Sequence, residues 1–203
     1  HIAFTSDRTT PGVSQDVADI SPQGTPELGN IFVMAPDGSE VTQVTNGAYA
    51  DQRPTFSPDG STIVFVSNRD DRVGLWRIPT DVSEPPTPLP YRGFGYRPWF
   101  GVDGTTVYFF TIDGERHRVA RIGLDDDTVE LLPNDDRGWT HGTFADPNGE
   151  VLIAHSTRID GHYRLFEIPL DGSPMREIPI EGVGHPMHGT RSPNDLSTYD
   201  DAD

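Results

Sequence analysis

Four stretches of this chain repeat one another at a nearly constant spacing. Two of them begin with Arg-Pro and two with His-Gly, and successive copies start 44, 44 and 47 residues apart. The first three lead through a turn that ends in Gly into a short apolar run. A period of this length is typical of a tandem array of one structural unit. The four copies are Arg53-Pro54-Thr55-Phe56, Arg97-Pro98-Trp99-Phe100, His141-Gly142-Thr143-Phe144 and His188-Gly189-Thr190-Arg191.

Each unit is predicted to form four short β-strands. The Arg-Pro or His-Gly segment is the first strand, and it ends at an Asp-Gly or Asn-Gly turn, where Gly supplies a positive φ. The second strand is the apolar run at 63–66, 107–110 and 151–154, because Val, Ile, Phe and Tyr favour strands. A polar hairpin leads to a third strand, and another turn leads to a shorter fourth strand. The third strands are predicted at 31–34, 75–78, 119–122 and 165–168.

Tandem four-stranded antiparallel units of about 40–45 residues build β-propellers, because such a sheet buries both faces only when neighbours stack on it. The sequence therefore predicts one all-β domain over 1–203, a β-propeller of about four blades. The chain enters at a second strand (2–5) and ends on a first strand (187–193), so pairing of these terminal strands is predicted to close the ring. An eight-bladed ring of two chains and a larger ring containing this chain are the alternatives. The predicted repeats are 1–50, 51–94, 95–138 and 139–186, with a loop insertion at 9–28 and a frayed tail at 196–203.

The composition excludes several classes of partner. A formal charge of −17 would repel nucleic acid and anionic membrane surfaces at long range. All 15 basic residues are Arg, since the chain contains no Lys. Without Cys, neither a disulfide framework nor a thiolate metal site can form. No run approaches the roughly 20 apolar residues of a membrane-spanning helix, so no membrane insertion is expected.

Three phrases of the chain closely resemble the repeat of the TolB-type propellers, and the resemblance extends more loosely over nearly the whole sequence. The same repeat occurs in periplasmic TolB, which binds protein partners, in the propeller domains of prolyl-oligopeptidase-like peptidases, and in oligogalacturonate lyases. The resemblance implies a propeller with a ligand or partner surface at its axis, in a periplasmic or secreted protein. The chain contains no Gly-x-Ser-x-Gly motif, so serine peptidase chemistry is not supported. The phrases are Ile2-Ala3-Phe4-Thr5-Ser6-Asp7-Arg8, Asn30-Ile31-Phe32-Val33-Met34-Ala35-Pro36-Asp37-Gly38-Ser39 and Phe56-Ser57-Pro58-Asp59-Gly60-Ser61-Thr62-Ile63-Val64-Phe65-Val66-Ser67-Asn68-Arg69.

The first strand of each blade lines the central channel, so equivalent residues of the repeat are predicted to converge there. Arg can grip a carboxylate or phosphate with two parallel hydrogen bonds. An axial site for an anionic ligand follows, either an acidic saccharide or a segment of a protein partner, in a non-enzymatic binding module that is a monomer or a dimer. The alternative is that these Arg side chains fill the channel mouth and pair with Asp51 or Asp135. The predicted ligand-binding residues are Arg53, Arg97, His141 and His188 in one column, with aromatic walls from Tyr96, Trp99 and Trp139.

Histidines are concentrated in the last third of the chain, and three of them suggest a metal site. His185 and His188 are close in sequence, and His141 would come from the adjacent blade. Neutral imidazole suits a divalent ion such as Mn, Zn or Ni, although the binding-module interpretation needs no cofactor. The resemblance to oligogalacturonate lyases implies the rival function, in which a metal and an Arg stabilise the enolate during β-elimination on uronate oligosaccharides.

Overall fold

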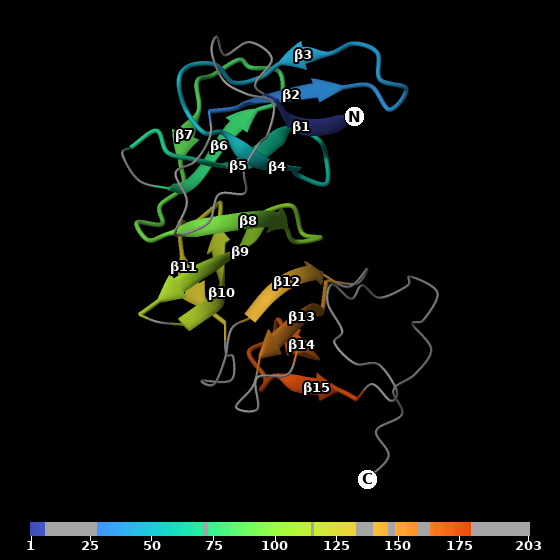
Figure 1. Cartoon of the computed structure of the whole chain (residues 1–203), viewed down its shortest axis with the longest axis vertical. Coiled ribbons are helices and arrows are strands. Elements are labelled where there is room, and N and C mark those ends of the chain that lie inside the picture. The colour runs from blue at the N-terminus through green and yellow to red at the C-terminus, as the bar shows by residue number, and fades with distance from the viewer. Residues whose placement is uncertain are drawn as a thin grey trace. The chain divides into compact units, whose positions relative to one another are not determined.

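The computed structural model describes residues 1–6, 28–70, 73–114, 116–132, 140–145, 149–157 and 163–179. In these ranges all regular structure is β, and fifteen strands form four antiparallel sheets (Figure 1). No helix of the described residues is long and apolar enough to cross a membrane. The strands are β1 (Ile2–Ser6), β2 (Asn30–Met34), β3 (Thr42–Gln43), β4 (Gln52–Phe56), β5 (Thr62–Ser67), β6 (Gly74–Pro79), β7 (Thr87–Pro88), β8 (Gly95–Phe100), β9 (Thr106–Asp113), β10 (Arg116–Gly123), β11 (Val129–Leu131), β12 (Thr140–Ala145), β13 (Val151–Thr157), β14 (Tyr163–Pro169) and β15 (Arg176–Ile178).

The strand order in every sheet follows the chain, as a four-stranded repeat requires. Three sheets have the orders β4-β5-β6-β7, β8-β9-β10-β11 and β12-β13-β14-β15. The remaining sheet has the order β1-β2-β3, and β1 pairs with β2 as β5 pairs with β6. β1 therefore holds the place of a second strand, as predicted. The prediction of an all-β protein built from antiparallel four-stranded units is confirmed.

Several tight turns are fixed by an Asp side chain that accepts hydrogen bonds from residues close to it in sequence. Asp59 Oδ1 accepts from the Ser61 backbone N–H at 3.0 Å and from the Ser57 hydroxyl at 2.6 Å. Gly60 follows with φ +74, a conformation that L residues resist. Asp103 and Gly104 repeat this arrangement in the next sheet. Asp59-Gly60 and Asp103-Gly104 are thus the turns that join first and second strands in these two sheets.

The chain divides into two compact units, the first comprising 1–112 and 120–130. Within it, the sheets β1–β3 and β4–β7 share a core of buried residues from both. Ala3 and Phe56 pack against this core. Burying each large apolar side chain contributes roughly 1.5–3 kcal/mol, so this contact holds the two sheets together. The core residues are Ile31, Val33, Val44, Ile63, Phe65, Trp76 and Ile78.

The next sheet approaches β6 closely because its first strand begins with Gly. A Cβ at Gly95 would lie 2.9 Å from Cγ of Leu75 and 3.3 Å from a ring carbon of Phe109. Since side chains alternate between the faces of a strand, Gly95 and Phe109 lie on the face toward β4–β7. Tyr96 and Phe110, one residue further along, lie on the opposite face. The inner strands β4 and β8 are also in contact.

The second unit comprises 113–119 and 131–203, and its described part contains the sheet β12–β15. Ala154 of β13 pairs with Phe166 of β14, and both side chains are fully buried. Ile168 is fully buried on the same strand as Phe166. The predicted closing strand at 187–193 and the tail at 196–203 lie outside the described residues, as does the insertion at 9–28 except for Leu28.

Candidate functional site

Arg53 and Arg97 occupy equivalent positions in two successive sheets, Arg53 in β4 and Arg97 in β8. In both sheets the register between the inner strand and its neighbour shifts at this point, forming a β-bulge. The backbone of both residues is left-handed, with φ +54 at Arg53 and +49 at Arg97. A residue before Pro normally stays extended, and a left-handed residue other than Gly costs roughly 1–3 kcal/mol. Strain of this kind is concentrated at functional sites.

The two guanidinium groups are close enough for their charges to interact. Burial lowers the pKa of Arg53, and the like charge of Arg97 lowers it further, while Tyr96 opposes both effects. Burial raises the pKa of Tyr96 to about 12, with the charges of Arg97 and Arg53 acting in the opposite direction. The three side chains therefore share one partly buried environment. The structure brings these three predicted ligand-binding residues together.

The fourth predicted residue in this region, Trp99, belongs to an aromatic cluster on the same face of the sheet as Tyr96. Its ring centroid lies 5.7 Å from that of Tyr108, with the planes 20° apart, and 5.8 Å from that of Phe110. The Tyr96 ring lies 5.4 Å from the Phe110 ring. Among the described residues, the buried Nε1 of Trp99 has no hydrogen-bond partner. These contacts hold Trp99 and Tyr96 in one aromatic cluster on this face of the sheet.

Asp51, considered from the sequence as a partner of Arg53 or Arg97, is held by a different group. Its side chain is completely buried, accepting the Ser67 hydroxyl on Oδ1 at 2.6 Å and the Arg69 guanidinium on Oδ2 at 2.5 Å. The Arg69 guanidinium also lies 4.3 Å from the centre of the Tyr49 ring. This network ties the start of β4 to the end of β5, so both carboxylate oxygens of Asp51 serve the fold.

The other predicted site residues fall largely outside the described part of the chain. The backbone of His141 lies in β12, opposite His155 of β13. Trp139, His185 and His188 lie outside the described residues, as does Asp135. Within the described ranges, no group of three or more His, Cys, Asp or Glu side chains could hold a metal ion. The predicted site at His141, His185 and His188 stays a prediction.

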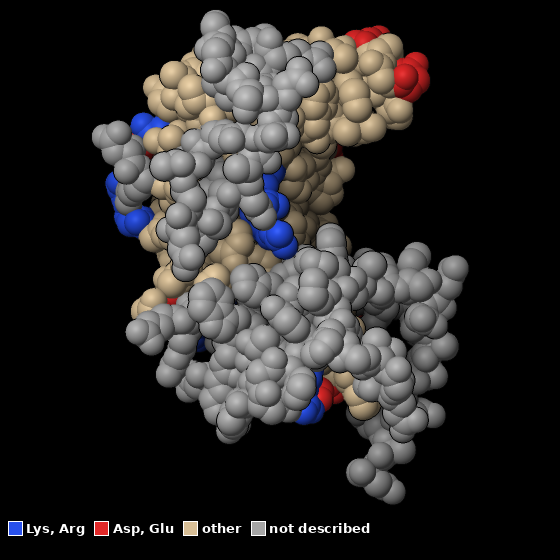
Figure 2. All heavy atoms as spheres, viewed as in Figure 1, with Lys and Arg blue, Asp and Glu red and all other residues tan. Residues whose placement is uncertain are grey.

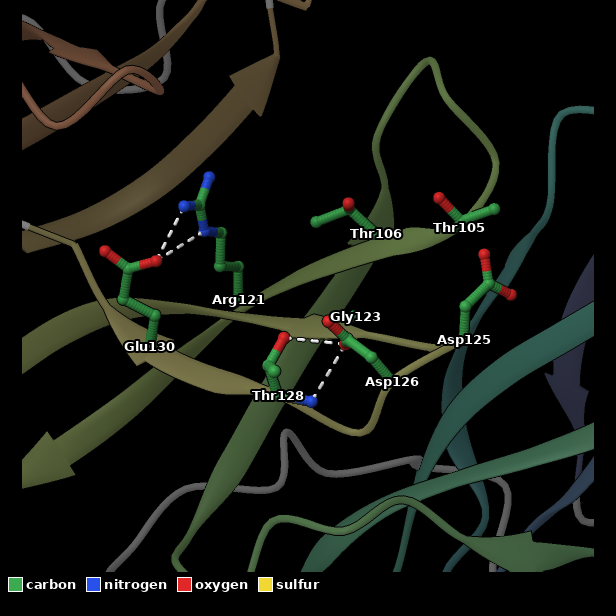
Figure 3. A pocket seen from close by; sticks show the side chains of 8 residues that line it. All are labelled: Thr105, Thr106, Arg121, Gly123, Asp125, Asp126, Thr128 and Glu130. Carbon is green, nitrogen blue, oxygen red and sulfur yellow. Dashed lines mark hydrogen bonds and ion pairs between the residues drawn. The ribbon is translucent and has the colours of Figure 1, made fainter.

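A separate polar pocket of about 250 Å³ opens over β9, β10 and β11, shown in Figure 3. Arg121 donates from Nε and from a terminal nitrogen to one oxygen of Glu130, at 3.0 and 2.6 Å. Asp126 accepts hydrogen bonds from Thr128, which lowers the pKa of its carboxyl group. The carboxylates outnumber the single guanidinium, so an anion is not the ligand this pocket suits. Its lining residues are Thr105, Thr106, Arg121, Gly123, Asp125, Asp126, Thr128 and Glu130.

Acidic side chains are concentrated in hairpin turns. On the face drawn in Figure 2, the largest red group lies at the upper right, where Figure 1 shows the hairpin between β2 and β3. That hairpin carries Asp37 and Glu40. Asp81 and Asp171 likewise cap exposed turns through the residues that follow them. These carboxylates lie in turns, whereas Arg53 and Arg97 lie in the strands β4 and β8. The net negative charge of the chain therefore does not prevent a positively charged group on those strands.

Two features of this region escape sequence reasoning. The left-handed backbone at Arg53 and Arg97 has no local signal, because the Pro that follows each predicts extended structure. The pairing of Asp51 with Arg69 joins residues eighteen positions apart and depends on strand register. The recurrence of Ser-Asn-Arg or Ser-Asp-Arg at the end of a second strand, at 67–69 and 6–8, is the only pattern that could have suggested it.

Comparison with known proteins agrees with this geometry. The family model described as TolB beta propeller domain matches residues 2–188. An uncharacterized protein of Agrobacterium fabrum is 28% identical over 133 residues, covering 60% of this chain and 44% of the relative. The solved structure of a TolB-type protein from Agrobacterium tumefaciens has a TM-score of 0.64 at 20% identity, covering 74% of this chain and 56% of that one. The chain thus spans about half the length of these two relatives.

Two further solved structures share the fold at lower identity. Hydrazine synthase of Kuenenia stuttgartiensis has a TM-score of 0.62 at 15% identity, covering 89% of this chain and 32% of that one. A prolyl endopeptidase has a TM-score of 0.55 at 12% identity, covering 78% of this chain and 27% of that one. Proteins with such different names share an architecture and not a function. The repeated antiparallel sheets and the match over residues 2–188 establish that this chain belongs to the TolB β-propeller family.

Proposed function

We propose that this chain is a non-enzymatic binding module whose inner strands hold an anionic group of a ligand or partner. One observation carries the proposal. Arg53 and Arg97 come from successive blades, each lies in a bulge with left-handed backbone, and their charges interact. Two partly buried like charges repel each other, and an anion between them removes that repulsion. Tyr96 and Trp99 supply an apolar wall that strengthens the interaction by lowering the local dielectric.

The proposal includes a closed ring of about four blades, in which the segment 187–193 adds a strand to the edge of β1. The three-stranded sheet supports this, because β1 stands at its edge where β5 has β4 beside it. β1 is also less buried than β5, with Ile2 41% exposed whereas Ile63 to Val66 are fully buried. Closure would place His141 and His188 in the same column as Arg53 and Arg97. We place the protein outside the cytoplasm, as the resemblance to periplasmic TolB suggests.

Calorimetric titration with two acidic ligands tests the function. An oligogalacturonate represents the acidic saccharide, and a Glu-rich peptide represents the segment of a protein partner. We expect at least one to bind, more weakly as salt is raised, because exposed charges are screened, and more weakly in variants lacking Arg53 or Arg97. Neutral oligosaccharide and Gln-rich peptide are the matched controls.

Two results would contradict the proposal. Equal binding of the acidic ligands and their neutral controls would show that charge is not what the site recognises. Metal-dependent appearance of the ultraviolet absorbance of unsaturated uronates from the oligogalacturonate would assign β-elimination instead, and would direct attention to His141, His185 and His188.

A further inference from the structure

We propose that Asn46 is a modification site, at which the backbone nitrogen of Gly47 displaces ammonia from the side-chain amide and isoaspartate is formed. The inference is independent of the proposed function. Gly follows Asn at two places in the chain, Asn46-Gly47 and Asn148-Gly149. Asn148 lies outside the described residues, so the structural argument concerns Asn46.

The Asn46-Gly47 pair is exposed, and both of its reacting groups are available. The two residues lie at the surface, in the loop that follows β3. No hydrogen bond within the described part of the chain engages the side-chain amide of Asn46 or the N–H of Gly47. The amide carbon is the electrophile and the backbone nitrogen is the nucleophile of ring closure. No contact therefore has to break before the two groups meet.

The fold requires Gly at position 47. Gly47 has φ +111, a conformation that L residues resist. A Cβ on it would also lie 2.7 Å from a ring carbon of Tyr49, and the Tyr49 ring is itself held against the guanidinium of Arg69. Gly has no side chain to shield its backbone nitrogen, so ring closure is least hindered before Gly. The packing of Tyr49 thus preserves the residue that makes Asn46 reactive.

The reaction needs no reagent other than water. The Gly47 nitrogen loses its proton to solvent and bonds to the Asn46 side-chain carbon. The bond from that carbon to the amide nitrogen breaks, and the nitrogen takes up a proton and leaves as ammonia. Water then opens the resulting five-membered succinimide at one of its two carbonyl carbons. Opening at the former backbone carbonyl gives isoaspartate, and opening at the former side-chain carbonyl gives aspartate.

Comparable residues are restrained. Asn30 is 2% exposed, the side-chain oxygen of Asn68 accepts the Ala50 N–H at 2.8 Å, and neither of these Asn residues precedes Gly. Four Asp-Gly pairs offer a similar backbone nitrogen, but each carboxylate accepts the N–H of the residue two positions later. An ionised carboxylate is also a poor electrophile. These four pairs begin at Asp37, Asp59, Asp103 and Asp171.

The product alters the loop that contacts Arg69. In isoaspartate the main chain runs through the former side-chain carbon, so it is one atom longer, and the former backbone carbonyl becomes a free carboxylate. In the unmodified chain, that carbonyl oxygen of Asn46 accepts a hydrogen bond from Arg69 at 3.3 Å. Tyr49 is anchored nearby, since its carbonyl accepts the Gly29 N–H at 2.9 Å. A longer link between Asn46 and Tyr49 should displace the Tyr49 ring from Arg69 and lower Tm.

The test follows the native full chain during storage at neutral pH. Peptide mapping by mass spectrometry locates each conversion, and enzymatic methyl transfer to isoaspartate measures the product. We expect Asn46 to convert about tenfold faster than Asn30 and Asn68, or more, with isoaspartate as the main product. The same measurement in urea gives the rate of the unfolded chain, and the native rate at Asn46 should lie within about tenfold of it.

Three variants separate the chemistry from its structural effect. Asn46→Gln keeps an uncharged amide but would have to close a six-membered ring, so conversion should be lost while Tm is unchanged. Asn46→Asp carries the negative charge of the product on an unaltered main chain, so the stored isoaspartyl protein should unfold at a lower temperature than this variant. Asn148→Ser removes the other Asn-Gly pair and should leave conversion at Asn46 unchanged.

Conversion of Asn46 in urea but not in the native chain would overturn the inference, because it would show that the fold protects this residue. Conversion of Asn30 and Asn68 at the rate of Asn46, or an unchanged rate of product formation in Asn46→Gln, would also overturn it. If the isoaspartyl protein and Asn46→Asp have the same Tm, the proposed effect on the Arg69 contact is wrong. Each of these results leaves the proposed function to its own test, since none depends on anion binding.

Discussion

Replacing Arg53 with Gly should separate stability from binding, because the side chain sits on a backbone that favours Gly. An L residue in the left-handed region costs roughly 1–2 kcal/mol, and Arg53 has φ +54. Gly removes this cost but gives the unfolded chain more freedom, which costs about 0.5–1 kcal/mol. We therefore expect Arg53→Gly to leave the free energy of unfolding unchanged or to raise it by up to about 1.5 kcal/mol. The same reasoning applies to Arg97, with φ +49.

Arg77→Gly is the matched control, since Arg77 lies in the regular extended strand β6 and pairs with Thr87. It should lose about 0.5–1 kcal/mol, so the two Gly variants should differ by roughly 1–2 kcal/mol. Urea unfolding followed by circular dichroism measures both. For a domain of this size, 1 kcal/mol corresponds to about 2–4 °C in Tm, so calorimetry can check the result. If Arg53→Gly is destabilised as much as Arg77→Gly, the left-handed strain is not present and the argument fails.

Three further perturbations test the electrostatics of the fold. Asp51→Asn leaves the largely buried Arg69 without its counter-charge, so it should lower the free energy of unfolding in urea by about 3 kcal/mol. Asp113→Asn is the control, because its ion pair has a carboxylate that is 54% exposed, and it should cost less than about 1 kcal/mol. Equal losses in the two variants would refute the role of burial. Hydrogen bonds from Ser57 and Ser61 lower the pKa of Asp59 to about 2. The contribution of this carboxylate to stability is therefore complete above the pKa of the unfolded chain and is lost as pH falls from about 5 toward 2. An NMR titration of the Asp59 carboxyl carbon that gave the ordinary pKa of an Asp would contradict this. Burial raises the pKa of Tyr96 to about 12, so the contribution of this phenol to stability is complete below pH 10 and is lost as pH rises toward 12. In an ultraviolet titration, Tyr96→Phe should remove a phenol that ionises late and leave the phenols that ionise earlier unchanged.

The strands and turns were accessible from sequence because their causes are local. The Asp59-Gly60 turn needs an acceptor two residues before a donor and a residue that accepts positive φ, and both requirements are visible in the letters. The run 63–66 is apolar throughout because β5 is buried on both faces, which a blade between two others requires. The convergence of Arg53 with Arg97 was also predicted, since a tandem repeat brings equivalent positions to equivalent places.

The conformation and partners of those residues were not accessible in the same way. The Pro after Arg53 predicts an extended residue, yet the bulge makes it left-handed, because pairing with β5 and contact with β8 outweigh the local preference. Asp51 was considered as a partner of the inner Arg residues, and the register of β4 with β5 gives it to Arg69 instead.

The sequence by itself determined the repeat, the all-β class, the turn positions and the family, because a period and a hydrophobic pattern are properties of the chain read in order. The tertiary structure decided that Arg53 interacts with Arg97, that the Asp51 carboxylate binds Arg69, and that the backbone is strained at the two bulges. These outcomes depend on strand register and on side chains brought close from positions about 44 residues apart. These side-chain interactions become strong only when folding has excluded water from between the sheets, because water screens charges.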